Sequence, residues 1–302
     1  MRSKMSPVTT SDLSAIIPVG DFIEHKENIT RIIQQSTEAG IELIIVIDNQ
    51  DQSVFVDAIS LFRDLKGNGS IIRSESGNPG GSRNLGLSRA TRKWVTFWDC
   101  DDAPDATQVV EMTSNQGVAE CDVLIGSYEV QNLLNLRVNE HKIELNHWKI
   151  DVGLNPGIWR FVFKREFVVN LSFPDLKMGE DQVFLQRVFS KTPHVCVSQL
   201  TVYRYRINVP GQLTSGKSNI NSLIEANQLA LEEYRLLSTK SRTIDAMLIR
   251  QFLTLSKYSS SLKTSAGYLL SALYLLVKNP KILLRLSSIY ASRKARIAPV
   301  KK

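Results

Sequence analysis

The sequence predicts an α/β protein whose mainly parallel central sheet is flanked by helices and followed by a C-terminal helical extension. Strand-like apolar runs alternate with helical stretches through the first hundred residues. One run, 42–47, is continuously apolar, as a strand buried on both faces should be. Polar loops begin at Asp48 and Asp99, where strands end and where such sheets bind their ligands.

The elements of the first part follow from the period of their apolar residues. The expected strands are 14–19, 42–47, 70–74 and 94–98. The expected helices are 26–39, which Gly40 ends, 55–65 and 83–90.

The second part is less regular. Strands are expected at 122–131 and 195–205, a hairpin or meander at 136–149, a helix start at 161–170, and helices at 180–190 and from about 220 to the end. We therefore predict a catalytic domain over 12–215, with a donor-binding half (12–105) and an acceptor-binding half (106–215). A basic, amphipathic helical tail follows over 220–302.

The positive charge is concentrated in this tail. The formal net charge is +7, and no Asp or Glu follows Asp245, whereas eleven Lys and Arg residues do. The rest of the chain is therefore mildly acidic. This asymmetry predicts an anionic surface as partner of the tail. Nucleic acid is disfavoured, because the basic residues accompany leucines and not a basic, aromatic folded face.

The cysteines and the N-terminus predict a cytoplasmic protein. Cys100, Cys121 and Cys196 are odd in number and widely spaced, which favours free thiols in a reducing compartment. Residues 1–14 carry no apolar run, so no secretory signal peptide is expected.

The sharpest local feature is the acidic run Asp99-Cys100-Asp101-Asp102. Carboxylates this close repel one another unless a cation or a helix dipole compensates. Their hard oxygens suit Mn²⁺ or Mg²⁺, which bridge to substrate phosphates. The alternative is an acidic loop that caps the next helix, with Asp102 or Asp105 as N-cap.

A second acidic pair, Glu180-Asp181, begins the helix expected at 180–190. One interpretation is a general base that takes a proton from an attacking hydroxyl. The other is that both carboxylates only complement the positive end of the helix dipole.

Three arginines are candidates for anion binding. Arg83 follows a glycine-rich turn at a helix start, a suitable place for anionic groups. Arg204 and Arg206 have the side-chain chemistry to bind a diphosphate through paired hydrogen bonds. An exposed basic edge strand is the alternative interpretation of Arg204 and Arg206.

Five segments occur in the order and spacing of a known family. They are Ser14-Ala15-Ile16-Ile17-Pro18-Val19, Ile44-Ile45-Val46-Ile47-Asp48, Gly80-Gly81-Ser82-Arg83-Asn84-Leu85-Gly86, Phe97-Trp98-Asp99-Cys100-Asp101-Asp102 and Gly179-Glu180-Asp181-Gln182. In these segments the sequence resembles the family 2 glycosyltransferases of the Rossmann-like GT-A fold, of the bacterial polysaccharide or glycolipid type, over about 12–215.

The resemblance implies inverting transfer of a sugar from a nucleoside diphosphate sugar, with a UDP-sugar favoured, to a glycan or lipid-linked hydroxyl. Asp99 and Asp101 match the Asp-x-Asp motif that holds Mn²⁺ or Mg²⁺, and Asp102 extends that motif. Asp181 matches the catalytic base, with Glu180 beside it.

The resemblance also assigns a donor nucleotide pocket. Pro18, Asp48, Arg83 and Asp99 match positions that line it. The chain departs from the family at Asp48-Asn49-Gln50-Asp51, where Asp-Asp-Gly-Ser is usual, and at Gly20-Asp21, where an aromatic or polar residue usually follows Pro-Val. The Gln-x-x-Arg-Trp motif of processive synthases is not evident, which favours addition of a single sugar.

The acceptor and the tail carry two further predictions. Trp159 is expected either to stack on an acceptor sugar or to pack in the core. The apolar run 266–277 is shorter than the roughly 20 residues of a bilayer span. With 282–290 it suits an interfacial helix on anionic lipid at the inner face of the membrane. A helical subdomain packed on the catalytic body and a homodimer interface are the alternatives.

Two other function classes fit the sequence less well. A sugar nucleotidyltransferase would need a glycine-rich N-terminal phosphate loop with Lys or Arg, which Ile17-Pro18-Val19-Gly20-Asp21 does not supply. A non-catalytic membrane-associated relative is disfavoured, because Asp99, Asp101 and Asp181 are all present.

Overall fold

The computed structural model describes residues 10–209 and 220–287. Within these ranges the strands form one sheet in the order β3-β2-β1-β4-β8-β6-β9-β5, and β7 pairs with β6. The strands are β1 (Leu13–Val19), β2 (Glu42–Asp48), β3 (Gly69–Ser74), β4 (Trp94–Phe97), β5 (Ala103–Pro104), β6 (Val123–Asn132), β7 (Val138–His141), β8 (Phe161–Lys164) and β9 (Val195–Ile207). The α-helices are α1 (Phe22–Glu38), α2 (Gln52–Asp64), α3 (Pro79–Arg89), α4 (Ala106–Ser114), α5 (Trp148–Leu154), α6 (Arg165–Val168), α7 (Glu180–Ser190), α8 (Ile220–Leu236), α9 (Arg242–Tyr258) and α10 (Leu262–Lys278).

The first half of the sheet has the predicted parallel arrangement. Strands β3, β2, β1 and β4 pair in parallel, and β1 and β2 are buried along nearly their whole length because both faces are covered. The helices between them begin where side chains cap them. Asp21 accepts from the backbone of Glu24 at α1, and Asn78 from that of Gly81 at α3. Because the four strands run parallel, their carboxyl ends lie at one edge of the sheet, where a ligand site was expected.

The second half is mixed, and two sequence-based predictions hold there only in part. A helix start was expected within 161–170, and α6 does begin at Arg165, but 161–164 form strand β8, which is antiparallel to both β4 and β6. Its four residues insert between two buried strands, so their apolar character reflects the sheet core. The predicted meander at 136–149 supplies β7, but 148–154 is the helix α5. Strands β6 and β9 pair in parallel.

The expectation of free thiols is wrong for two of the three cysteines. Cys121 precedes β6 and Cys196 lies in the neighbouring β9, with Cα atoms 5.9 Å apart, and the two form a disulfide. The parallel pairing brings positions 75 residues apart into contact, which sequence spacing does not reveal. Cys100 keeps a free thiol.

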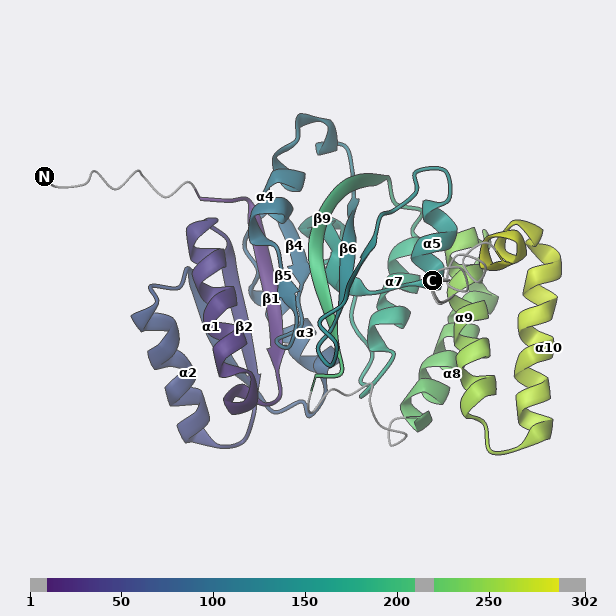
Figure 1. The fold of residues 1–302 in the computed structure, drawn as a ribbon, viewed down its shortest axis with the longest axis horizontal. Coiled ribbons are helices and arrows are strands. Elements are labelled where there is room, and N and C mark those ends of the chain that lie inside the picture. The colour runs from purple at the N-terminus through teal and green to yellow at the C-terminus, as the bar shows by residue number, and fades with distance from the viewer. Residues whose placement is uncertain (1–9, 210–219, 288–302) are drawn as a thin grey trace, which may run out of the picture.

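The C-terminal helices pack on the catalytic body (Figure 1). Helix α9 contacts α5, α7, α8 and α10, and its residues Ile244, Met247, Leu248 and Phe252 join the core that Phe163 and Phe184 also build. Farther on, Arg285 donates to both carboxylate oxygens of Asp151 at 2.6 and 2.7 Å. The helical part from 220 to 287 is thus fixed to the body.

The outer face of α10 remains exposed. Leu270, Leu273 and Val277 have 66%, 54% and 73% of their surface accessible. No helix within the described ranges has the length and apolar character needed to cross a bilayer. The predicted domain boundary near 215 and the tail residues 288–302 lie outside the described residues.

Candidate active site

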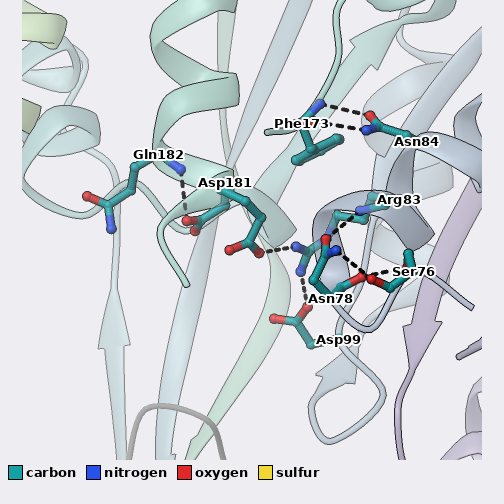
Figure 2. Close-up of polar contacts among 10 residues, drawn as sticks. Ser76, Asn78, Arg83, Asn84, Asp99, Phe173, Asp181 and Gln182 are labelled. Carbon is teal, nitrogen blue, oxygen red and sulfur yellow. Dashed lines mark hydrogen bonds and ion pairs between the residues drawn. The ribbon is translucent and has the colours of Figure 1, made fainter. Parts of the chain in front are cut away.

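Three segments far apart in the sequence meet at Arg83 (Figure 2). Arg83 lies in the second turn of α3, Asp99 follows β4, and Glu180 begins α7. The Nη2 of Arg83 donates to Asp99 Oδ1 at 2.8 Å, and its Nη1 donates to Glu180 Oε1 at 2.5 Å. One guanidinium therefore connects the two acidic motifs that the sequence singled out.

Burial makes this bridge strong. Arg83 and Glu180 are each only 5% exposed. Burial by itself would lower the pKa of Arg83, but Asp99, Glu180 and Asp181 together raise it above its ordinary value. Arg83 thus stays charged. Its partners, Asp99 and Glu180, both lie in the acidic motifs that the resemblance assigns to the site.

Asp181 has the proton affinity of a general base. Burial, and then the neighbouring charge of Glu180, raise its pKa to about 7, while Arg83 and Arg250 oppose this rise. One carboxylate oxygen accepts from the backbone of Gln182 at 2.8 Å, which orients the group. A carboxylate with a pKa near 7 takes up and releases protons efficiently at neutral pH.

The acidic loop after β4 holds carboxylates that burial and mutual repulsion push toward protonation. Burial and then Asp99 raise the pKa of Asp101 to about 6. The pKa of Asp102 is raised well above its usual range by burial and by Asp101 and Asp99. A divalent cation between Asp99 and Asp101 would relieve this repulsion.

The donor set fits a metal that substrate phosphates help to bind. Within the described residues, no group of three His, Cys, Asp or Glu side chains is arranged around a common metal position. Mg²⁺ and Mn²⁺ sites of nucleotide enzymes need only one or two protein carboxylates, since phosphate oxygens and waters complete them. Asp99 and Asp101 meet that requirement. Asp102 is fully buried, and its Oδ1 accepts from the backbone of Arg206 at 2.7 Å.

Two residues that hold the acidic loop carry no signal in the sequence. Asn28, on α1, donates from its Nδ2 to the carbonyls of Cys100 at 2.8 Å and of Asp102 at 2.6 Å. The hydroxyl of Tyr203, on β9, accepts from the backbone of Asp99 at 3.0 Å. The alternation of Tyr and Arg along 203–206 predicts only that the two tyrosines share one face of a strand, and it does not indicate the contact with Asp99.

The structure separates the two arginines that were expected at the diphosphate. Arg206 lies at the acidic loop, where its Nη1 donates to Asn28 Oδ1 at 2.6 Å. Arg204 lies two residues earlier on β9, where its Nε donates to Glu129 Oε2 of the neighbouring β6 at 2.8 Å. The structure thus brings Arg206, and not Arg204, to the acidic motif.

Trp159 lies in an aromatic cluster beside the site. Its ring stacks on Tyr203 at 4.6 Å and on Tyr205 at 5.5 Å between centroids, and meets Tyr128 edge-on at 4.8 Å. The ring is partly buried. The packing role is therefore observed, and the contact with an acceptor sugar stays a prediction.

The expected nucleotide pocket is at the ends of β1 and β2. Pro18 is half-buried in β1, and Asp48 ends β2. Asp48 accepts from the backbone of Gly77 and from the hydroxyl of Ser76, both at 3.2 Å. These contacts connect the end of β2 to the loop that leads into α3, the helix that carries Arg83. Asp105, the alternative helix cap, does cap α4 by accepting from the backbone of Gln108.

A comparison with protein families identifies the class of one segment of the chain. Residues 25–169 match the family model described as Glycosyl transferase family 2. The chain carries a glycosyltransferase family 2 domain. The matched segment contains Asp48, Arg83, Asp99 and Asp101, whereas Asp181 lies beyond it.

Relatives of this glycosyltransferase domain agree with the assignment. The chain is 22% identical over 214 residues to the glycosyltransferase GlyA of Streptococcus pneumoniae, a match that covers 65% of this chain and 30% of the relative. The chain thus spans less than a third of that curated relative's length.

Solved structures show the same fold. S. aureus TarS (residues 1–349), crystallised with UDP-GlcNAc, is similar with a TM-score of 0.65 and 16% identity, over 87% of this chain and 81% of that one. The mannosyltransferase PcManGT of Pyrobaculum calidifontis, in complex with GDP-Man and Mn²⁺, has a TM-score of 0.56 and 14% identity, over 92% and 82%. The predicted GT-A fold is therefore confirmed.

Proposed function

We propose that the protein transfers one sugar, with inversion, from a nucleoside diphosphate sugar to a hydroxyl of a glycan or lipid-linked acceptor. The observation that carries this proposal is the Arg83 bridge between Asp99 and Glu180. This bridge supports the proposal because it joins the acidic loop at Asp99 to the start of α7, which also carries Asp181. Structures similar to this one contain UDP-GlcNAc, UDP or GDP-Man, which supports a nucleotide sugar as donor. A UDP-sugar is favoured.

Asp181 is the proposed general base. It accepts the proton of the acceptor hydroxyl as the hydroxyl oxygen attacks the anomeric carbon. The bond from that carbon to the diphosphate breaks on the opposite side, so the configuration inverts. Glu180 is occupied by Arg83 and is assigned to hold Asp181 and Arg83 in place.

Asp99 and Asp101 are the proposed protein ligands of Mn²⁺ or Mg²⁺. Bound there, such an ion would neutralise charge on the departing diphosphate. Asp102 is assigned to hold the loop through the backbone of Arg206. Pro18 and Asp48 are proposed to contact the nucleotide, and Trp159 the acceptor.

Calorimetric titration tests the donor site. UDP and GDP are titrated with and without Mn²⁺ into wild type, Asp101→Ala and Asp57→Ala. Asp57 is exposed on α2, so it controls for the loss of one negative charge. We expect one nucleotide to bind, with an affinity that falls at least tenfold without Mn²⁺ or without the Asp101 carboxylate. Equal binding in all three proteins would reject the metal-assisted site.

The exposed face of α10 is proposed to dock on an anionic membrane surface at the cytoplasmic side. Its apolar residues Leu269, Leu270, Leu273 and Val277 stand in the same helix as Lys263 and Lys278. Apolar side chains interspersed with Lys on one helix suit the interface of an anionic bilayer. Such docking would bring the site to a lipid-linked acceptor.

A further inference from the structure

Arg250, on α9, is a cation that the proposed reaction has not used. Its guanidinium forms no hydrogen bond or ion pair with any residue in the described ranges, although the side chain is mostly shielded from water. A charged group without a partner is costly to bury. Arginines retained in this condition are candidates for ligand binding.

The surroundings of Arg250 bring it near Asp181, the proposed base. Helix α9 packs on both α7, which begins with Glu180 and Asp181, and α5. The charged and titratable groups that act on Arg250 are Asp181, Tyr128 and Tyr205. Arg83, which binds Asp99, also acts on Asp181, whereas the cations that act on Asp101 are His25 and Arg206. Arg250 therefore acts on Asp181 and not on Asp101.

A second guanidinium lies close to the same tyrosine. Arg160 is 3% exposed, and its guanidinium carbon is 5.1 Å from the centre of the Tyr128 ring. Its Nη2 donates to the carbonyl of Asn155 at 2.6 Å. The carboxylate that acts on it, Asp151, is bound at both oxygens by Arg285. Arg160 is thus a second buried cation beside Tyr128, and it forms no ion pair of its own with Asp151 within the described residues.

We propose that Arg250 binds an anionic group of the acceptor, a phosphate or carboxylate next to the hydroxyl that Asp181 deprotonates. This proposal rests on the proposed function, because it gives the acceptor of that reaction its chemical class. A guanidinium presents paired N–H donors that match such oxyanions. Arg160 supplies further positive potential behind Tyr128. The acceptor is thus an anionic glycan or lipid-linked chain and not a neutral sugar.

Inorganic phosphate and acetate serve as probes. Each is titrated by NMR into wild type, Arg250→Gln and Arg242→Gln, with and without saturating UDP and Mg²⁺. Arg242 is exposed at the start of the same helix and is the matched control. UDP affinity is measured on all three proteins. Thermal unfolding checks the fold, and Arg250→Lys tests whether charge alone is sufficient.

The expected result is weak binding of phosphate or acetate to wild type and Arg242→Gln, with an at least tenfold higher Kd in Arg250→Gln. UDP affinity should stay unchanged, the Tm of Arg250→Gln should not fall because a costly buried charge is removed, and Arg250→Lys should restore part of the binding. Equal loss of UDP and oxyanion binding in Arg250→Gln would place Arg250 in the donor site and overturn the proposal. Absence of oxyanion binding to wild type would also overturn it. A failure of UDP to bind at all concerns the donor site, and the titrations without nucleotide still decide the question of Arg250.

Discussion

Nη1 of Arg83 lies 2.5 Å from Oε1 of Glu180, a residue 97 positions later in the chain. Both side chains are buried, so neither can exchange its partner for water. This pair joins α3 to α7, the helix that carries the proposed base.

Removing the Arg83 guanidinium should destabilise the fold strongly. We expect Arg83→Met to lower the free energy of unfolding by roughly 3 kcal/mol, because a buried carboxylate loses its counter-ion. Urea unfolding measures this. Arg31→Met breaks the exposed Arg31–Glu27 pair and should cost less than about 1 kcal/mol. If the Arg83→Met, Glu180→Gln double variant lost the full sum of the single effects, the two residues would not be coupled.

Asp181 should make the fold less stable as the pH rises. Its folded-state pKa of about 7 lies above the unfolded value, so the folded state binds more protons between those two values. The cost of ionising this buried group therefore grows from about pH 4 and is complete above pH 7. We expect Asp181→Asn to raise the Tm relative to wild type at pH 8, and by little at pH 5. Asp57→Asn, at an exposed position, should show no such trend; a constant difference at all pH values would contradict the raised pKa.

The α10 face should control membrane binding. We expect wild type to sediment with vesicles of anionic lipid, less so at high salt because screening weakens the contribution of the lysines. Leu270→Glu with Leu273→Glu should abolish sedimentation. Leu236→Glu is the matched control, since Leu236 is 86% exposed at the end of α8. A wild-type dimer that the double variant splits, without any vesicle binding, would identify a subunit interface instead.

One thiol per chain should react after denaturation without reductant. The disulfide Cys121–Cys196 leaves Cys100 as the free cysteine, and a thiol reagent in denaturant counts it. Cys196→Ser should lower the free energy of unfolding by up to about 4 kcal/mol, since the bond closes a long loop of the unfolded chain. Three reactive thiols in the untreated protein would show that the pair is reduced.

Much of the first half of the fold was predictable because its central strands are almost continuously apolar. Residues 42–47 are apolar at every position, and parallel strands buried on both faces require this. The acidic runs at Asp99 and Glu180 were also evident, because clustered carboxylates are uncommon without compensation. Their connection through Arg83 depends on tertiary structure alone.

The remaining elements lacked such a signal. A four-residue apolar run such as 161–164 is compatible with either a strand or a helix, so β8 was missed. Asn28 lies on an ordinary amphipathic helix, and its side chain has no sequence feature that marks a contact with Cys100 or Asp102. Arg250 was counted with the basic tail, because charge along the chain does not show which lysines and arginines face a site.

The shared core of α5, α7 and α9 limits how this enzyme can be re-engineered. A hybrid that exchanges only the segment after the GT-A sheet for that of a homologue would mismatch the surfaces that Met247 and Phe252 present to the catalytic body. Gly153 illustrates the constraint, because a methyl group added there would overlap the backbone of Thr243. A workable exchange must therefore carry α5, α7 and the C-terminal helices together as one cassette.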